Sequence, residues 1–78
     1  MTVYSFTVQV TGINVSEDGF QDALFEAGCA DALPVVVDGT LFLDFDREAP
    51  SYNSAISSAK RDIEHAGGRV LQIERSGD

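Results

Sequence analysis

The sequence predicts an α+β domain whose six elements run in the order strand, helix, strand, strand, helix, strand. Segments 3–10 and 69–75 alternate apolar and polar residues, as half-buried strands do. Two β-rich runs, 33–37 and 40–46, flank Asp38-Gly39, which is the strongest short-range signal for a β-hairpin. Two stretches with apolar residues at helical spacing separate these strands. This order is that of the ferredoxin-like fold, for which we expect a four-stranded antiparallel sheet in the order 4-1-3-2, with both helices on one face.

The first predicted helix follows a turn at Gly12 and Asn14, with Ser16 as its expected N-cap and Gly28 as the residue that ends it. Phe25 lies off the apolar stripe of this helix, and we expect it to pack under a loop rather than to anchor a partner. The stripe itself comprises Phe20, Ala23, Leu24 and Ala27.

The second predicted helix has Pro50 in its first turn and Gly67-Gly68 at its end. In the strand that follows, Leu71 and Ile73 are expected to point into the core. The apolar stripe of this helix comprises Tyr52, Ala55, Ile56, Ala59, Ile63 and Ala66.

The length of 78 residues predicts one domain, which we expect over residues 1–75, followed by a polar tail at 76–78. Cys29 is the single cysteine, so no disulfide within the chain is expected. No apolar run approaches the roughly 20 residues that span a bilayer. The first residues lack the basic region and cleavage site of a signal peptide. The expectation is therefore a cytoplasmic protein that does not associate with membranes.

The charge is concentrated in the first part of the chain. Residues 1–50 hold nine acidic residues and one basic residue, whereas residues 51–78 hold four of each sign. The net charge of −8 repels nucleic-acid phosphate, whose binding needs clustered Lys and Arg. We therefore expect no direct nucleic-acid binding by this segment.

An apolar cluster is expected on the sheet face away from the helices. A two-residue turn at Asp38-Gly39 pairs Val37 with Thr40, Val36 with Leu41 and Val35 with Phe42. Leu41 belongs to the predicted core, and so does Val36. The opposite face then holds the predicted interface residues Val35, Val37, Phe42, Val3 and Val70. Such a cluster favours a homo-oligomer or protein-partner interface, with an ordinary exposed sheet as the alternative.

Asp18, Asp22 and Glu26 are spaced four residues apart and form a stripe of one charge on the predicted first helix. The stripe fits either a surface that meets a basic partner or a merely solvated helix face.

Two further groups of residues resemble functional sites. Asp44, Asp46 and Glu48 alternate like the ligands of a divalent cation, but they lack the spacing of a calcium loop, and Glu48 is expected beyond the end of the strand. Cys29 and His65 could act as nucleophile and base, but nothing in the sequence brings them together. The sequence therefore predicts no catalytic residues, no metal site and no cofactor.

Three stretches resemble the N-terminal domain of small bacterial helix-turn-helix DNA-binding regulators of about 150 residues: EAGCADAL (26–33), LFLDFDREAP (41–50) and DIEHAGGRVLQIE (62–74). In that family a helix-turn-helix follows near the point where IERSGD ends this chain. The resemblance implies a truncated or stand-alone form of the domain, and it supplies no catalytic or ligand residues.

The function expected from these observations is that of a non-enzymatic module of a bacterial regulator or antitoxin-like system, which oligomerises or binds a protein partner. Two alternatives stay open. One is a small-ligand sensor, for which the sequence shows no convergent polar pocket. The other is an acidic mimic of nucleic acid that inhibits a basic protein, suggested by the charge of residues 1–50.

Overall fold

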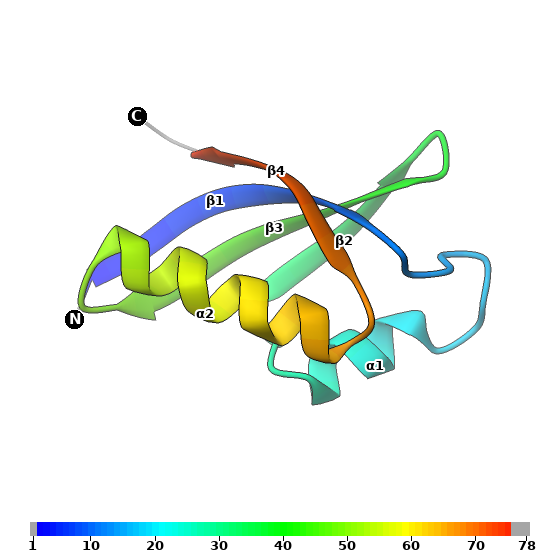
Figure 1. Ribbon diagram of the computed structural model, residues 1–78, viewed down its shortest axis with the longest axis horizontal. Coiled ribbons are helices and arrows are strands. Elements are labelled where there is room, and N and C mark those ends of the chain that lie inside the picture. The colour runs from blue at the N-terminus through cyan, green and yellow to red at the C-terminus, as the bar shows by residue number, and fades with distance from the viewer. Residues whose placement is uncertain (1, 76–78) are drawn as a thin grey trace.

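The computed structural model describes residues 2–75 and shows six elements (Figure 1). The expected tail and truncation point at 76–78 lie outside the described residues. All neighbouring strands are antiparallel, and the sheet order is β2-β3-β1-β4, which is 4-1-3-2 when counted from the β4 edge. The α+β class and the antiparallel four-stranded sheet are confirmed. The elements are β1 (Thr2–Thr11), α1 (Phe20–Glu26), β2 (Ala32–Val37), β3 (Thr40–Ala49), α2 (Tyr52–His65) and β4 (Arg69–Arg75).

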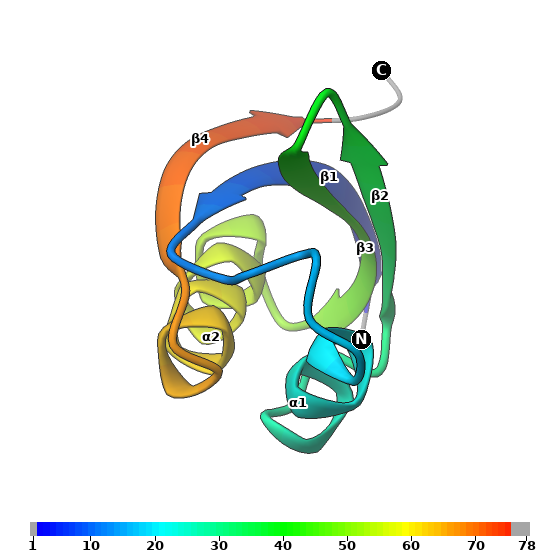
Figure 2. The same cartoon turned by 90° about the vertical axis from the view of Figure 1, so that its right-hand side faces the viewer.

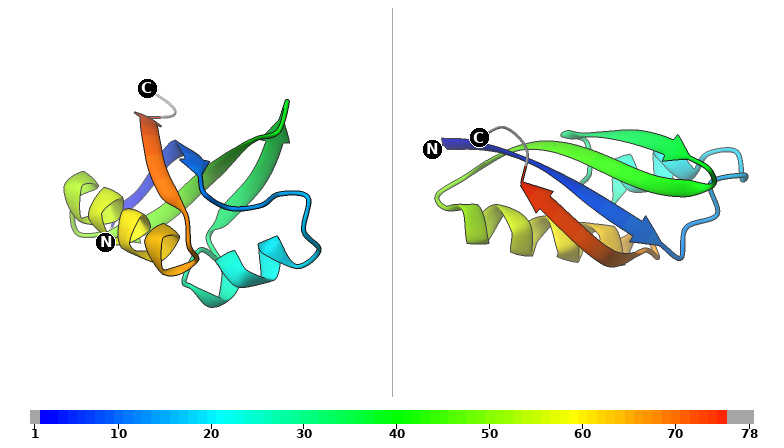
Figure 3. Two further views of the ribbon diagram at one scale, coloured as in Figure 1. Left: turned by 45° about the vertical axis from the view of Figure 1, so that its right-hand side comes forward. Right: turned by 90° about the horizontal axis from the view of Figure 1, so that it is seen from above.

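Both helices lie on the concave face of the sheet, which arches over them (Figure 2). In this view α2 lies beneath β4 and β1, and α1 lies on the side of β2. The hairpin end of β2 and β3 rises away from the helices, as the left panel of Figure 3 and the view in Figure 1 agree. Within residues 2–75, the opposite, convex face carries no helix. The arrangement is consistent with a ferredoxin-like fold.

The core forms where the inward residues of β1 and β3 meet the apolar face of α2. The rings of Phe6 and Phe45 stack with centroids 5.2 Å apart, and Tyr52 packs edge-on against Phe6. The predicted stripe of α2 is confirmed, since its six members are either buried or packed against the core. The fully buried large side chains are Phe6, Val8, Leu24, Leu41, Leu43, Phe45 and Ile63.

The hairpin between β2 and β3 is confirmed with its predicted register. Asp38 and Gly39 have φ angles of 51° and 78°, so both central turn residues adopt the left-handed conformation of a type I′ turn. Val35 consequently pairs with Phe42, and Val37 pairs with Thr40.

Strand β3 is longer than the sequence predicts. It continues through Arg47 and Glu48 to Ala49, so Pro50 precedes the cap of α2 instead of lying in its first turn. Glu48 is therefore in the strand, opposite Val3, and the expectation that it lies beyond the strand end is wrong. The extension occurs because the partner strand β1 runs to Thr2 and keeps pairing with β3.

Helix α1 starts later than predicted. Its N-cap is Gly19, which has a φ of 90° and gives no side-chain cap, so the assignment of Ser16 as N-cap is wrong. Two turns precede the helix instead, and the Ser16 N–H donates to Asn14 Oδ1 at 3.0 Å. Gly28 ends the helix as predicted: its N–H donates to the Phe25 carbonyl, and the Cys29 N–H donates to the Leu24 carbonyl, the pattern of a Schellman motif.

A β-bulge in β4 reverses two predicted orientations. Gln72 pairs with Gln9, but Val70 pairs with Val10, which leaves Leu71 as the extra residue. Val70 consequently packs against the core, whereas Leu71 is 56% exposed. The placement of Val70 on the open face and of Leu71 in the core is therefore wrong, because strict alternation fails at a bulge.

Candidate interaction surface

Exposed apolar side chains gather around the edge strand β2. Among residues 2–75, seven large apolar residues are exposed, and five of them lie on β2 or on the adjacent α1. Together with the half-buried Phe42, which pairs with Val35, they lie on both sides of this sheet edge. We call this area the β2 surface; it comprises Phe25, Leu33, Val35, Val36, Val37 and Phe42.

The open-face half of this surface is the part that the hairpin register predicts. Leu33, Val35 and Val37 alternate along β2, and Phe42 lies opposite Val35 on β3. Leu33 is 64% exposed, although it is an apolar residue within a sheet. Edge strands usually carry charged residues that prevent contact with other chains, and β2 carries none.

On the helix side of the sheet edge, one residue of β2 and one of α1 are more exposed than the sequence predicts. Val36 is 45% exposed although its partner Leu41 is buried, so its assignment to the core is wrong. The hairpin end rises away from the helices, and the seven-residue α1 does not cover it. Phe25 is 65% exposed and does not pack under a loop as expected.

A groove lies between α1 and β2 on this helix side. Its volume is about 190 Å³. Buried Leu24, Cys29 and Leu43 line it together with Phe25 and Pro34. The lining also includes Gln21, Asp22 and Ala32. Sequence periodicity misses this groove because Phe25 is out of phase with the apolar stripe of its helix.

The other predicted interface residues do not join the β2 surface. Val3 is exposed on the open face, but it lies opposite Glu48, beyond the end of β2. Val70 belongs to the core side, as described above. Of the five predicted interface residues, Val35, Val37 and Phe42 belong to the β2 surface. The surface also includes Phe25, Leu33 and Val36, which were not among the predicted interface residues.

The predicted acidic stripe is divided by the late start of α1. Asp22 and Glu26 are exposed on the helix, whereas Asp18 lies in the preceding turn. Asp22 also lines the groove. The acidic group that borders the β2 surface therefore consists of Asp22 and Glu26 from α1, with Asp38 in the hairpin turn and Asp44 opposite Leu33.

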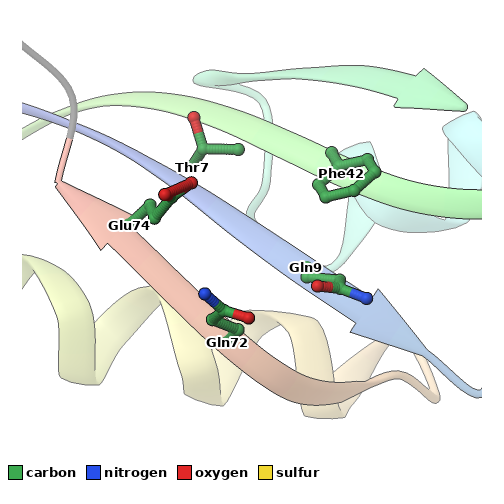
Figure 4. Close-up of a pocket in the computed structure, with 5 residues that line it drawn as sticks. All are labelled: Thr7, Gln9, Phe42, Gln72 and Glu74. Atoms are coloured by element: carbon green, nitrogen blue, oxygen red, sulfur yellow. The ribbon is translucent and has the colours of Figure 1, made fainter. Parts of the chain in front are cut away.

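A small hollow lies on the open face above β1, with Phe42 on one side and Gln72 and Glu74 on the other (Figure 4). Thr7 and Gln9 complete its lining. The volume of about 50 Å³ is far below the roughly 300–1,000 Å³ of small-molecule sites. This hollow gives the ligand-sensor alternative little support.

The acidic residues of β3 lie in a row on the open face. Ser5 Oγ donates to Asp46 Oδ1 at 2.6 Å, and Thr7 Oγ1 donates to Asp44 Oδ1 at 3.3 Å. Hydroxyl groups of the neighbouring strand β1 thus donate hydrogen bonds to the carboxylates of Asp44 and Asp46. Within residues 2–75, no group of three or more His, Cys, Asp or Glu side chains is arranged to hold a metal ion.

Sequence reasoning missed the buried Arg47, whose side chain extends from β3 between the two helices. Its Nε and Nη2 donate to the carboxylate of Asp31 at 2.8 and 2.9 Å, and its Nη1 donates to Asp62 Oδ2 at 3.0 Å. Ser58 Oγ and the Gly28 carbonyl accept the remaining bonds, at 3.0 and 2.8 Å. Arg47 thereby ties the end of α1 to α2 and positions the wall of the groove. It is the single basic residue of positions 1–50 and is in phase with Leu41, Leu43 and Phe45, and these two signals could have identified it.

Cys29 is buried beside this arginine, and His65 lies in the last turn of α2. Burial, reinforced by the Asp62 carboxylate, raises the pKa of the Cys29 thiol to about 11. A thiol with a raised pKa holds its proton at neutral pH and is a poor nucleophile.

Comparisons with protein-family models, with curated proteins and with solved structures return no match to this chain. Among residues 2–75, the helices are too short and too polar for any of them to cross a membrane.

Proposed function

We propose that this chain is a non-enzymatic protein-interaction module that binds through the β2 surface. The observation that carries the proposal is the concentration of exposed apolar side chains along one sheet edge. Contiguous apolar patches on small domains mark interaction sites, because burying them stabilises a complex by about 25 cal/mol per Å² before the cost of association.

The biological setting belongs to the same proposal. The resemblance of EAGCADAL, LFLDFDREAP and DIEHAGGRVLQIE to the N-terminal domains of bacterial regulators supports a cytoplasmic regulator or antitoxin-like system. The acidic charge supports a protein partner over nucleic acid. A second copy of the chain, the homo-oligomer expected from the sequence, would occupy the same surface.

Site-specific photocrosslinking tests the proposal whichever protein binds. A photoreactive phenylalanine analogue replaces Val35 in one variant and Leu71 in the other. Both positions are exposed, but Leu71 lies at the opposite edge of the sheet. We expect a discrete crosslinked product in cells from position 35 and none from position 71. Equal crosslinking from the two positions, or none from either, would overturn the proposal.

A further inference from the structure

We infer that the β2 surface binds a basic amphipathic helix of a different protein, with one bulky apolar side chain seated in the groove between α1 and β2. This inference rests on the proposed function and adds the chemistry of the partner. It follows from three properties of the surface: its backbone, its concavity and its charge.

The backbone of β2 is poorly suited to adding a strand from another chain. The pair next to a two-residue turn is hydrogen-bonded, so Val37, Val35 and Leu33 direct their backbone groups toward β3. Val36 and Pro34 therefore direct theirs toward the free edge. Pro34 has no N–H to donate, and the Ala32 N–H is already bonded to the Cys29 carbonyl at 3.1 Å. Binding must then come mainly from side chains, as when a helix occupies a groove.

The groove has the size and lining of a socket for one apolar side chain. Its volume of about 190 Å³ is below that of a typical small-molecule site but accommodates a leucine or phenylalanine side chain. Buried Leu24, Cys29 and Leu43 line it, and the exposed Phe25 ring borders it. An aromatic or aliphatic anchor in such a pocket is the usual centre of an interface.

The charge around the β2 surface favours a basic partner over a second copy of this chain. Asp22, Glu26, Asp38 and Asp44 border the surface, and all four are exposed. The nearest basic residue in the sequence, Arg47, is 8% exposed and is held by Asp31 and Asp62.

The other basic residues among positions 2–75 lie on α2 and on β4, the opposite edge: Lys60, Arg61, Arg69 and Arg75. A two-fold dimer places the same patch against itself, which would here bring the acidic rims together. A partner with lysines or arginines flanking its apolar face is complementary to this rim.

A designed peptide provides a defined probe. The probe is a roughly 18-residue amphipathic helix with leucine on one face and lysine on the other, and the control peptide carries glutamate in place of lysine. We expect the lysine peptide to bind, with backbone amide shifts in a ¹⁵N-labelled chain centred on Leu24, Phe25, Cys29 and Ala32. The glutamate peptide should bind at least about tenfold more weakly.

Matched variants separate docking from general attraction to an acidic protein. Asp22→Lys and Glu64→Lys change the net charge equally at two exposed helix positions, but only Asp22 lines the groove. Asp22→Lys should weaken binding of the lysine peptide about fivefold, whereas Glu64→Lys should weaken it less than about twofold. Phe25→Ser should weaken it as well, and Leu71→Ser, a substitution at the opposite edge, should not.

The contrary results distinguish a failure of this inference from a failure of the proposed function. Equal effects of the two charge reversals, or no peptide binding, would overturn the inference. Amide shifts centred on Phe42 instead of the groove would overturn it while supporting the proposed function. A dimer in sedimentation that excludes the peptide would replace the basic partner with a second copy, again with the proposed function intact.

Discussion

The guanidinium of Arg47 makes a bidentate ion pair with the carboxylate of Asp31, with Nε 2.8 Å from Oδ2 and Nη2 2.9 Å from Oδ1. Asp31 lies between α1 and β2, while Arg47 also bonds Asp62 on α2. One buried side chain on β3 thus joins the connection between α1 and β2 to α2. Cys29, which lines the groove, lies between the two residues of that connection, Gly28 and Asp31, that Arg47 holds.

Arg47→Met should destabilise the chain by about 3–5 kcal/mol, because it leaves the Asp31 and Asp62 carboxylates without their buried partner. Urea unfolding monitored by circular dichroism measures the change. Arg47→Lys retains the charge but not the bidentate geometry, so we expect an intermediate loss. A free energy of unfolding for Arg47→Met within about 0.5 kcal/mol of wild type would show that the network has no stabilising role.

Stability should fall between pH 9 and pH 11 because of Cys29. Its pKa is raised to about 11 in the folded chain, whereas an exposed thiol ionises near 8.5. Below the lower value both states hold the proton, so the thiol contributes no pH dependence. Above it the unfolded state releases its proton first, and stability declines until the folded thiol also ionises.

The expected loss from this thiol is roughly 2–3 kcal/mol across that range. Cys29→Ala is the control, because it removes this thiol and no other ionisable group. Urea midpoints measured at pH 8, 9, 10 and 11 should decline more steeply for wild type than for Cys29→Ala. Parallel profiles would contradict the raised pKa.

Gly39→Val should destabilise the β2–β3 hairpin by about 1–3 kcal/mol, because Gly39 has a φ of 78° and a β-branched residue resists that conformation. Asp38→Asn is the control, since asparagine tolerates the φ of 51° at the neighbouring position. Thermal unfolding compares the two variants. Equal melting temperatures would argue against the type I′ turn.

Much of the fold could be predicted from local patterns. Alternation in β1 and β3 and the Asp38-Gly39 turn determine which side chains face the core, and tertiary structure preserves both. The misplacements occur where a single residue breaks the period: Leu71 forms the bulge in β4, and Gly19 delays the start of α1. Neither residue type carries an unambiguous signal in one sequence.

The sequence predicts only part of the candidate site. The part that follows from hairpin register is predicted, and the part that depends on tertiary packing is not. Val35, Val37 and Phe42 follow from hairpin register, which is a local property. The exposure of Val36 and Phe25 depends on how far a short helix reaches beneath the sheet, which no local pattern encodes.

Phe42→Asp should weaken association through the open-face half of the β2 surface, because it removes a half-buried apolar ring opposite Val35 and places a carboxylate beside Asp44. Sedimentation velocity at tens of micromolar tests for self-association, and crosslinking from position 35 tests for any other partner. Leu71→Asp introduces the same charge at the opposite edge and should change neither. Association that survives Phe42→Asp would place the contact elsewhere.

Hydroxyl-radical footprinting read by mass spectrometry tests the central claim most directly. It compares oxidation of Leu33, Phe25 and Leu71 in the isolated chain at low concentration with oxidation in the cells that produce it. All three side chains are exposed in the structure. We expect several-fold protection of Leu33 and Phe25 in cells, with Leu71 unchanged, because a bound protein covers the β2 edge and leaves the β4 edge free. Equal oxidation of Leu33 and Phe25 in the two samples would contradict the assignment of the β2 surface as a binding site.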